Sequence, residues 1–575
     1  MPSSHGAVQD SDRPILLSNR RRSGRYGLLA IALAAGCSSG GGDAVPTSGT
    51  GGTTHGATGG SGEAGHGNDA TGGITPISTG GRGLIGGDAT GGSGATGGSG
   101  ATGGSGGVGG APQATGGTTQ GATGGAPPVS NGAPTIVNDT FWKDTTGQNI
   151  YSQGGGVLKV GDTYYWYGVR YSNDASYAGD PSGSSQAITT YSSTDLVHWK
   201  PETVSKPANM GGWFGRLGVV YHAGTKKYVL AAQGGGGEYF ATSDAPGGPF
   251  VYNNVQMNLP GISTGSTGDQ TLFQDDDGAA YLVSSNSSGR SNRYLSPLRS
   301  SDFLAVEQAI PVYSGGGKEG NCMFKYMGTY VFCSSDLHGW NSSQTYCVSS
   351  SSVHGPWSAE FVLDGTQYDY SHVTQTGFFI TVQGTAGSFV IFAGDRWANN
   401  ASNGIGFNQW MPISFDGKTP HFHSFSKWSI DAKAGTFAVA HGNNWVLNPS
   451  FEADRVNVTT PVGWKATGGH NVLSSFHTGR WSWVLNASGT LEQQATAMPD
   501  GTYTLSVWAK AAGSGGQLMA KGCGGPDSTT PIPASSDYAN VKSAPITVSG
   551  GKCTVSLSAG SAQLTVDDFL LADGG

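Results

Sequence analysis

Residues 161–168, GDTYYWYG, and residues 189–200, TTYSSTDLVHWK, form a unit that recurs along the chain and decides its fold. Each unit begins with a turn, continues as a short aromatic strand, and ends with a second strand that runs into a polar pair and an aromatic residue. Its later copies are TKKYVLAAQ with YFATSDAPGGPF (225–233 and 239–250), DDGAAYLVSS with YLSPLRSSDF (276–285 and 294–303), MGTYVFCSS with TYCVSSSSVHGPW (327–335 and 345–357), and the more divergent GSFVIFAGDRW with NQWMPISFDGK (387–397 and 408–418).

A recurrence of roughly 50 to 60 residues, with several short strands and turn residues in each unit, is typical of a β-propeller. Each unit would be one blade, which buries its faces against its neighbours. The alternative is a β-sandwich whose internal similarity is accidental. We therefore expect an all-β protein with a five-bladed propeller over residues 134–440.

The five-fold pattern ends after His441. The segments NWVLNPSFEAD (444–454), GTYTLSVWAKA (501–511) and LTVDDFLLAD (564–573) follow it, with apolar and polar residues alternating along the strands. This alternation predicts an antiparallel β-sandwich of the jelly-roll type over residues 441–575.

The first 37 residues have the layout of a bacterial export signal. Four arginines at positions 20, 21, 22 and 25 precede a short apolar run, 27–35, which is too short to span a bilayer, and Cys37 follows two residues later. The small residues before Cys37 resemble a lipoprotein cleavage box, and the alternative is ordinary cleavage nearby. Both predict export, as a cell-surface lipoprotein or an extracellular protein.

Residues 38–133 read as a disordered linker. The tract is built from units such as TGGSGATGG. It carries much of the glycine of the chain, which has 99 glycines among its 575 residues. Such units lack the apolar side chains whose burial would offset the entropy of ordering. We expect a flexible tether between the export signal and the folded domains.

The composition limits the partners. The net charge is −8 and only 12% of residues are charged, and no basic stripe with interleaved aromatics is present, so we expect no nucleic-acid partner. Membrane contact is expected only through a lipid on Cys37, and the protein is expected to be a monomer. No cofactor or metal is indicated, although a structural calcium ion would be compatible with export. The run Asp275-Asp276-Asp277-Gly278 lacks the further ligands of a calcium loop and predicts a turn.

Export permits disulfides among the six cysteines. Cys523 and Cys553 could pair in the carboxy-terminal domain. Cys322, Cys333 and Cys347 could give one bridge and one free thiol, and the spacing matches no zinc site.

The innermost strands of a propeller converge on an axial cavity, so the residues at the blade starts would meet there. Glu319 and Asp269 are the acids at these positions. Two carboxyl groups facing one cavity suit glycoside hydrolysis, in which one acid protonates the leaving oxygen and a neighbour adjusts its pKa. Trp213 and Trp340 could stack on sugars. The alternative is that both acids only cap turns.

Several of these segments resemble glycoside hydrolase family 43, and most of all its exo-β-1,3-galactanase branch. The segments are IYSQGGGVLKVGDTYYWYG (150–168), GDQTLFQDDDGAAYL (268–282), KEGNCMFKYMGTYVF (318–332), VTQTGFF (373–379) and FAGDRW (392–397). The resemblance implies a five-bladed propeller that hydrolyses glycosidic bonds with inversion. It implies that Glu319 is the general acid, that Asp269 sets its pKa, and that Gln375 holds the attacking water. The expected sugar contacts are Trp213, Arg216, Trp340, Arg396 and Trp397.

The chain departs from the family where a catalytic base is expected. Most members carry an aspartate at the position of Gly154, although the galactanase branch lacks it. That branch has glutamates at the positions of Val169 and Gly215. Glu238 or Asp369 could substitute as the base.

His372 could contact a sugar hydroxyl or be a structural histidine. We expect an exported hydrolase acting on galactan or on arabinan- or xylan-type sugars. The alternative is a carbohydrate-binding propeller that has lost its base.

The carboxy-terminal domain resembles carbohydrate-binding modules. The resemblance rests on Asn-Pro-Ser-Phe-Glu at 448–452 and Val-Asp-Asp-Phe at 566–569. Its candidates for sugar stacking, against a role in the core, are Trp464, Trp481, Trp483 and Trp508.

Overall fold

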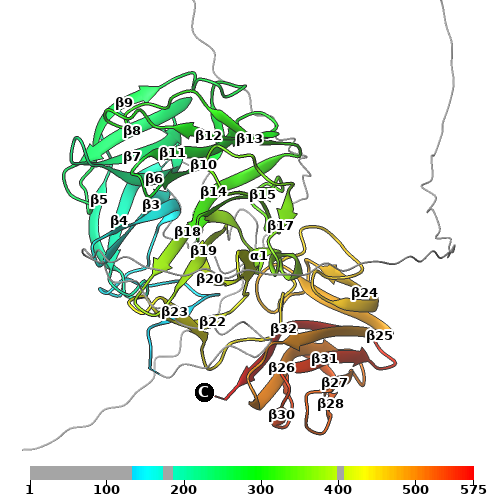
Figure 1. Cartoon of the computed structure of the whole chain (residues 1–575). Helices are drawn as coiled ribbons and strands as arrows, with labels where there is room; N and C mark the ends of the chain where they lie inside the picture. Colours follow the sequence, from blue (N-terminus) through cyan, green and yellow to red (C-terminus); the bar gives the residue numbers. More distant parts are fainter. Residues whose placement is uncertain (1–131, 172–184, 398–406, 575) are drawn as a thin grey trace, which may run out of the picture. The chain divides into compact units, whose positions relative to one another are not determined.

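The structure is a computed structural model that describes residues 132–171, 185–397 and 407–574 (Figure 1). All of them fall within one compact unit, Pro112–Gly575. The predicted export signal and nearly all of the predicted linker lie outside the described residues. In the part that is described, no helix is long and apolar enough to cross a membrane.

Five antiparallel sheets of four strands follow one another along the chain, each with its strands in sequence order. The first contains β2 (Gln153–Val160), β3 (Thr163–Tyr171), β4 (Ser185–Ser193) and β5 (Lys200–Ser205). The second contains β6 (Phe214–His222), β7 (Lys227–Gly234), β8 (Gly237–Ser243) and β9 (Val251–Gln256). The third contains β10 (Thr267–Gln274), β11 (Ala280–Asn286), β12 (Asn292–Pro297) and β13 (Ile310–Ser314). The fourth contains β14 (Lys318–Tyr326), β15 (Thr329–Asp336), β16 (Thr345–Ser350) and β17 (Phe361–Val362). The fifth contains β18 (Gln375–Gln383), β19 (Ser388–Arg396), β20 (Phe407–Asp416) and β21 (Thr419–Phe422).

A sixth sheet corrects the prediction of five blades, which is wrong. It has three strands, β1 (Thr135–Val137), β22 (Lys427–Asp431) and β23 (Thr436–Val439), in the order β1-β22-β23. Its apolar side chains share one buried cluster with the first and fifth four-stranded sheets. The repeat could not reveal this sheet, because β1 and β22 come from opposite ends of the propeller segment. The propeller is therefore a six-sheet arrangement.

Aromatic packing joins the sheets at this point. Trp166 of β3 and Trp410 of β20 are fully buried, with ring centroids 4.9 Å apart, and Trp142 and Trp199 pack around them. Each such ring buries about 150–250 Å² of mostly apolar surface. This cluster buries the aromatic strand of the first repeated unit.

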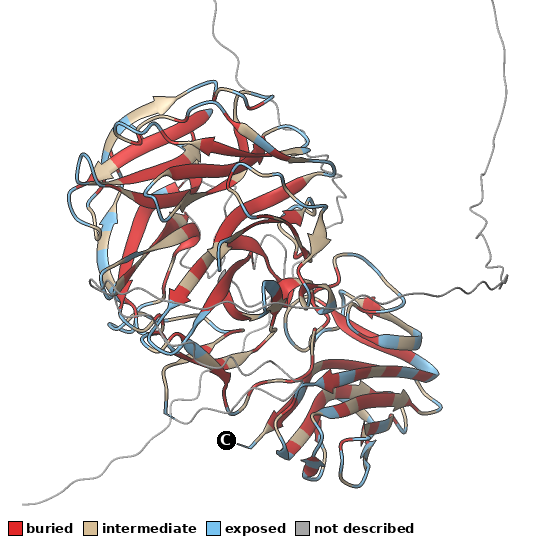
Figure 2. Cartoon of the chain, viewed as in Figure 1, coloured by how far each residue is buried: buried red, intermediate tan, exposed pale blue. Residues whose placement is uncertain are grey.

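The first strand of each four-stranded sheet is buried at its beginning, and β6, β14 and β18 are buried over most of their length (Figure 2). Each of these strands breaks register with its neighbour near its beginning, as between Glu319 and Cys322 in β14 or between Gly215 and Gly218 in β6. Such β-bulges redirect side chains and are common beside active sites. Gly320, in the β14 bulge, has a φ of 62°, which glycine adopts without strain.

The carboxy-terminal domain is one nine-stranded, barrel-like sheet, so the prediction of a two-sheet jelly-roll sandwich is also wrong. The main path runs β28-β27-β31-β25-β32-β26-β29, with β24 paired to β25 and β30 paired to β26. The strands are β24 (Lys465–Val472), β25 (Ser482–Thr496), β26 (Gly501–Ala511), β27 (Gly516–Lys521), β28 (Ser528–Ile532), β29 (Ser535–Lys542), β30 (Ile546–Val548), β31 (Lys552–Ala559) and β32 (Leu564–Asp573). The long β25 pairs with β32 at one end and with β31 at the other. This shared strand joins what would otherwise be two sheets.

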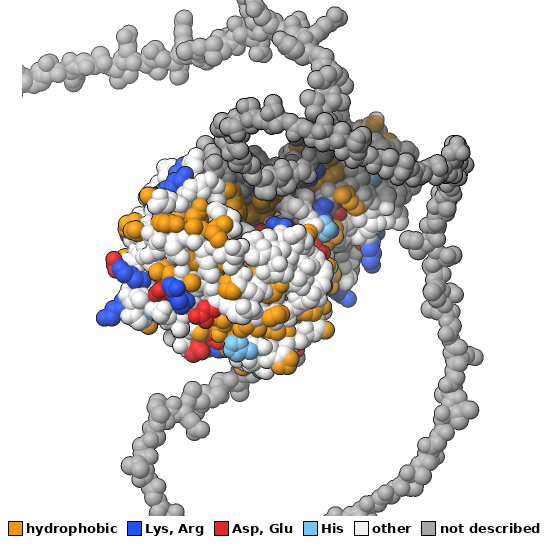
Figure 3. All heavy atoms as spheres, turned by 90° about the horizontal axis from the view of Figure 1, so that it is seen from above, with side chains coloured by type: hydrophobic (Ala, Val, Ile, Leu, Met, Phe, Trp, Pro, Cys, Tyr) orange, Lys and Arg blue, Asp and Glu red, His pale blue; other side chains and the backbone are white. Residues whose placement is uncertain are grey.

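Two disulfides lie within the described residues. Cys523 pairs with Cys553, as expected, and Cys333 pairs with Cys347 across β15 and β16. Cys322 is a buried free thiol. On the face drawn in Figure 3, uncharged side chains predominate and lysines and arginines stand in small separate groups.

Candidate active site

The bulged starts of the innermost strands bring polar side chains from the second, third, fourth and fifth sheets together, and the first sheet adds a backbone N–H group. Glu319 is the second residue of β14 and is 7% exposed. Gln375, the first residue of β18, donates from Nε2 to Glu319 Oε1 at 3.0 Å and also to the carbonyl of Gly339. The proposed proton donor and the proposed water-holding residue are therefore in direct contact.

Asp269 of β10 lies beside this pair and is held by a cation and a backbone amide. Arg216 of β6 places Nη2 2.8 Å from Asp269 Oδ2, and the Gly320 N–H donates to Asp269 Oδ2 at 3.2 Å. Arg216 Nη1 lies 2.8 Å from Oδ2 of Asp395 in β19. The Gly154 N–H in β2 donates to Asp395 Oδ1 at 3.3 Å. Arg216 thus bridges two carboxylates at the centre of the ring of strands.

An aromatic wall adjoins the polar groups. Trp397 donates from Nε1 to Gln375 Oε1 at 2.9 Å, and Trp340 packs edge-on against Trp397 with centroids 5.4 Å apart. The guanidinium of Arg216 lies over the Trp397 ring at 5.4 Å. Trp213 packs in the same apolar cluster and is partly buried. Aromatic faces beside polar anchors are the usual composition of a sugar site.

The electrostatics favour a protonated Glu319. Burial of the carboxyl group raises the pKa of Glu319 to about 8, and the nearby Asp269 carboxylate acts in the same direction. Arg290 and Arg216 oppose this shift. A carboxyl group with this pKa keeps its proton at neutral pH and can donate it. Burial also raises the pKa of Asp395, to about 6, although Arg216 opposes the shift.

Arg290 belongs to the site and was missed by the sequence reasoning. It lies in the loop between β11 and β12, with Nε 3.6 Å from Glu319 Oε2 and a terminal nitrogen 3.9 Å from Asp269 Oδ1. The surrounding sequence, SSNSSGRSNR, is a polar loop that carries no signal for such a role. Only the packing of that loop over the start of β14 brings the cation to the acid.

Arg396, an expected sugar contact, lies away from Glu319. Its guanidinium donates to Asp139 at 2.7 Å and to the carbonyls of His372 and Val373 at 2.6 and 3.2 Å. Side chains alternate between faces along a strand. Asp395 and Trp397 therefore point to the site, whereas Arg396 between them points to the other face. The alternation was readable from the sequence.

Neither substitute base contacts Glu319. Glu238 in β8 is completely buried and accepts a hydrogen bond from Gln270 Nε2 at 2.6 Å. Asp369 is 2% exposed and accepts from the His372 N–H and from the Ser424 hydroxyl. Both carboxyl groups are buried and hydrogen-bonded to other residues, away from Glu319. The identity of the base stays a prediction.

The positions that lack the family's acids are tightly packed. A Cβ atom on Gly215 would lie 2.8 Å from the Trp213 ring and 2.8 Å from the Tyr171 hydroxyl. Val169 is 1% exposed in β3. A glutamate at position 215 would require Trp213 or Tyr171 to move.

The four tryptophans considered for sugar stacking in the carboxy-terminal domain divide into two groups. Trp464, Trp481 and Trp483 are 0–5% exposed and belong to the core. Trp508 in β26 is half-buried and packs parallel to the His477 ring at 3.9 Å.

Residues 155–404 match the family Glycosyl hydrolases family 43. The propeller segment is therefore a family 43 glycoside hydrolase domain.

Among solved structures, the exo-β-1,3-galactanase of Phanerochaete chrysosporium with β-1,3-galactotriose is 23% identical, with a TM-score of 0.50, over 76% of this chain and 100% of that one. The exo-β-1,3-galactanase of Clostridium thermocellum is 20% identical, with a TM-score of 0.49, over 76% of this chain and 99% of that one. At this identity the first of these supports the fold. No curated protein matches the chain.

Proposed function

We propose that the chain hydrolyses β-1,3-linked galactan with Glu319 as the general acid. The contact between Glu319 and Gln375, beside the Asp269–Arg216 pair and the Trp397 wall, carries this proposal. The substrate class is supported by the motifs shared with the galactanase branch and by the galactotriose bound in the similar fungal structure. The export signal predicted from the sequence before Cys37 supports action outside the cell.

In the proposed reaction Glu319 gives its proton to the glycosidic oxygen as the bond to the anomeric carbon breaks. Asp269 keeps negative charge close to Glu319, which favours the protonated form. Gln375, which bonds to Glu319 through its amide, would orient the water that attacks the anomeric carbon, and this water releases its proton to the solvent because an amide cannot accept it. Attack from the face opposite the leaving group inverts the anomeric configuration.

The test is product release from β-1,3-galactan, arabinan and arabinoxylan by the full chain, with the anomer of the first product followed by proton NMR. We expect galactose to appear from β-1,3-galactan with inverted configuration. Release of arabinose or xylose alone would contradict the substrate, and a retained anomer would contradict the mechanism. Binding of galactan with no released sugar would support the carbohydrate-binding alternative.

A further inference from the structure

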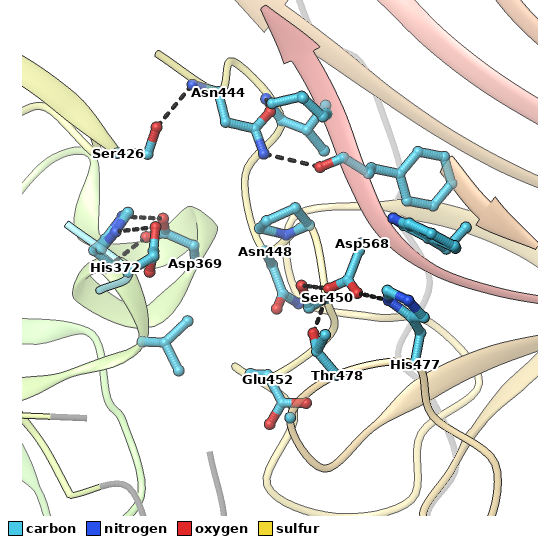
Figure 4. A pocket seen from close by; sticks show the side chains of 18 of the residues that line it. Asp369, His372, Ser426, Asn444, Asn448, Ser450, Glu452, His477, Thr478 and Asp568 are labelled. Atoms are coloured by element: carbon cyan, nitrogen blue, oxygen red, sulfur yellow. Dashed lines mark hydrogen bonds and ion pairs between the residues drawn. The ribbon is translucent and has the colours of Figure 1, made fainter. Parts of the chain in front are cut away.

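A cavity separate from the Glu319 cluster lies between the propeller and the carboxy-terminal domain (Figure 4). Its volume is about 450 Å³, within the range of sites for small molecules. The propeller side includes Asp139, His372 and Arg396, and the other side includes Glu452, His477 and Trp508. The cavity is large enough for one or two sugar residues.

The propeller wall of this cavity is held rigidly by hydrogen bonds. Residues 370–373, α1 (Tyr370–Val373), all have a φ between 51° and 59°, a left-handed turn made without glycine. Such a conformation is unfavourable for residues other than glycine and persists only where its surroundings impose it. Here Arg396 donates to the carbonyls of His372 and Val373, and His372 binds Asp139 and Ser424. Strained, well-supported backbone of this kind clusters at functional sites.

The opposite wall pairs an aromatic stack with a carboxylate. Asp568 accepts from Ser450 Oγ at 2.6 Å and from Thr478 Oγ1 at 2.7 Å, and it binds the His477 ring (Figure 4). His477 in turn stacks on Trp508, with 15° between the ring planes. The wall offers a fixed aromatic group next to hydrogen-bonding groups whose positions are set.

The charges lining the cavity are largely matched. Asp139 binds both Arg396 and His372, and Asp568 binds His477. A cavity in which acids and bases are already paired favours a neutral polar ligand over an ion.

Glu452 has an atom left for such a ligand. The residue is 8% exposed, and its Oε1 accepts from the backbone N–H groups of Arg480 and Trp481 at 2.6 and 2.7 Å. Its Oε2 is buried and has no hydrogen-bond partner among the described residues. Burial raises the pKa of Glu452 to about 8, so this carboxyl group is neutral at pH 7 and can donate as well as accept. An unmet buried polar atom is costly unless something pairs with it.

This cavity adjoins the candidate active site through the β18–β19 pair. Only Thr374 separates the α1 turn from Gln375 of the active site, and Arg396 of the cavity directly precedes Trp397 of the active site. The strands that position the active site therefore also supply the propeller wall of this cavity.

We propose that this cavity is a second saccharide-binding site, which takes a neutral sugar of the polysaccharide against the His477–Trp508 stack and Glu452. The site holds the polymer close to the propeller, and its existence does not depend on Glu319 being the general acid. Its ligand class follows from the matched charges, the aromatic stack and the unpartnered carboxyl oxygen.

The test compares binding of β-1,3-galactan and arabinoxylan by affinity electrophoresis. The full chain carries Glu319→Gln throughout, so that the polymer is not cleaved during the run. Adding Trp508→Ala is expected to weaken binding about tenfold, as loss of an aromatic contact does. Glu452→Gln, which keeps the size of the side chain, is expected to weaken it by a smaller factor. Trp357→Ala, at a half-buried tryptophan of the fourth sheet, is the matched control and should bind as the parent does.

The proposal is overturned if both the Trp508 and the Glu452 variants bind the two polymers like the parent, or if the parent binds neither. A thermal melt of each variant shows whether it is folded. Should Trp508→Ala fail to fold, the decision rests on Glu452→Gln, which retains the two backbone hydrogen bonds to residue 452. Weaker binding in the Trp508 or Glu452 variant, together with no sugar released by the chain that retains Glu319, would keep this site while rejecting the proposed hydrolysis.

Discussion

Two buried glutamates, Glu319 in the fourth sheet and Glu238 in the second, share a raised pKa but sit in different surroundings. Burial raises the pKa of each to about 8. Glu319 lies at a bulged strand start among charged groups, whereas Glu238 lies on a third strand, where Gln270 holds one of its oxygens. Glu319 is 7% exposed and Glu238 is 0% exposed.

The comparison shows that a raised pKa marks burial and does not by itself mark a catalytic acid. A proton donor must also be reached by a substrate and be surrounded by groups that respond to the reaction. Glu319 has the charged neighbours Asp269 and Arg290, and it keeps a small exposed surface beside the 32% exposed side chain of Arg290. Glu238 meets neither, so it serves as an internal control for Glu319.

The largest expected effect comes from replacing each of the two acids with glutamine. Glu319→Gln keeps the size of the side chain but removes its proton, and we expect kcat on β-1,3-galactan to fall by about 10²–10⁴-fold. Glu238→Gln should hydrolyse galactan at the rate of the unaltered chain. Steady-state release of galactose measures both. Equal rates for the two variants would remove the distinction between the two glutamates.

The pH profile should respond to the charges around Glu319. Since the acid must be protonated to act, kcat/KM is expected to fall as the pH rises through about 8. Asp269→Asn removes a charge that raises the pKa of Glu319, so the alkaline limb should move to lower pH. Arg290→Gln removes a charge that lowers this pKa, so the limb should move to higher pH.

Shifts in opposite directions are the critical result for this pair of variants. The pH profile of Glu238→Gln, in which the charges next to Glu319 are unchanged, provides the control. A limb that stays in place in both charge variants would show that another group controls the alkaline side.

The smallest expected effect is on stability. Here Glu238→Gln is the variant expected to change the measurement, whereas in the activity assays it is the control. The folded chain holds the Glu238 proton up to about pH 8, whereas the unfolded chain releases it above its ordinary value of 4.5. Stability from this group is therefore complete below the ordinary value and is lost as the pH rises toward 8. Glu238→Gln should raise the Tm by about 2–4 °C at pH 8 and change it little at pH 4. Calorimetry at the two pH values checks this, and an equal Tm at pH 8 would contradict it.

The repeated units could be recognised because each is local. The strands of a unit pair with strands that are near them in the sequence, as at residues 161–168 and 189–200. Their pattern can therefore be recognised in the sequence alone. The sixth sheet has no such signature, because Ile136 pairs with Trp428 from the far end of the segment. The barrel-like carboxy-terminal sheet was missed for a related reason, since β25 serves two partners.

The candidate site divides in the same way. The motifs around Glu319, Asp269, Gln375 and Trp397 identified side chains that the structure brings together. Arg290 had no motif, and Arg396, an expected sugar contact, lies on the face of its strand opposite Asp395 and Trp397, as the alternation along the strand indicates.

The sequence alone determined the repeating aromatic units, the family they belong to and which carboxyl groups stand at the strand starts. Only the tertiary structure decided which of the buried acids has charged neighbours, where Arg290 and Arg396 point, and that a cavity lies between the propeller and the carboxy-terminal domain. The reason is that strand pairing within a unit is a short-range property. Burial and electrostatic surroundings depend on residues that are distant in the chain and adjacent in space.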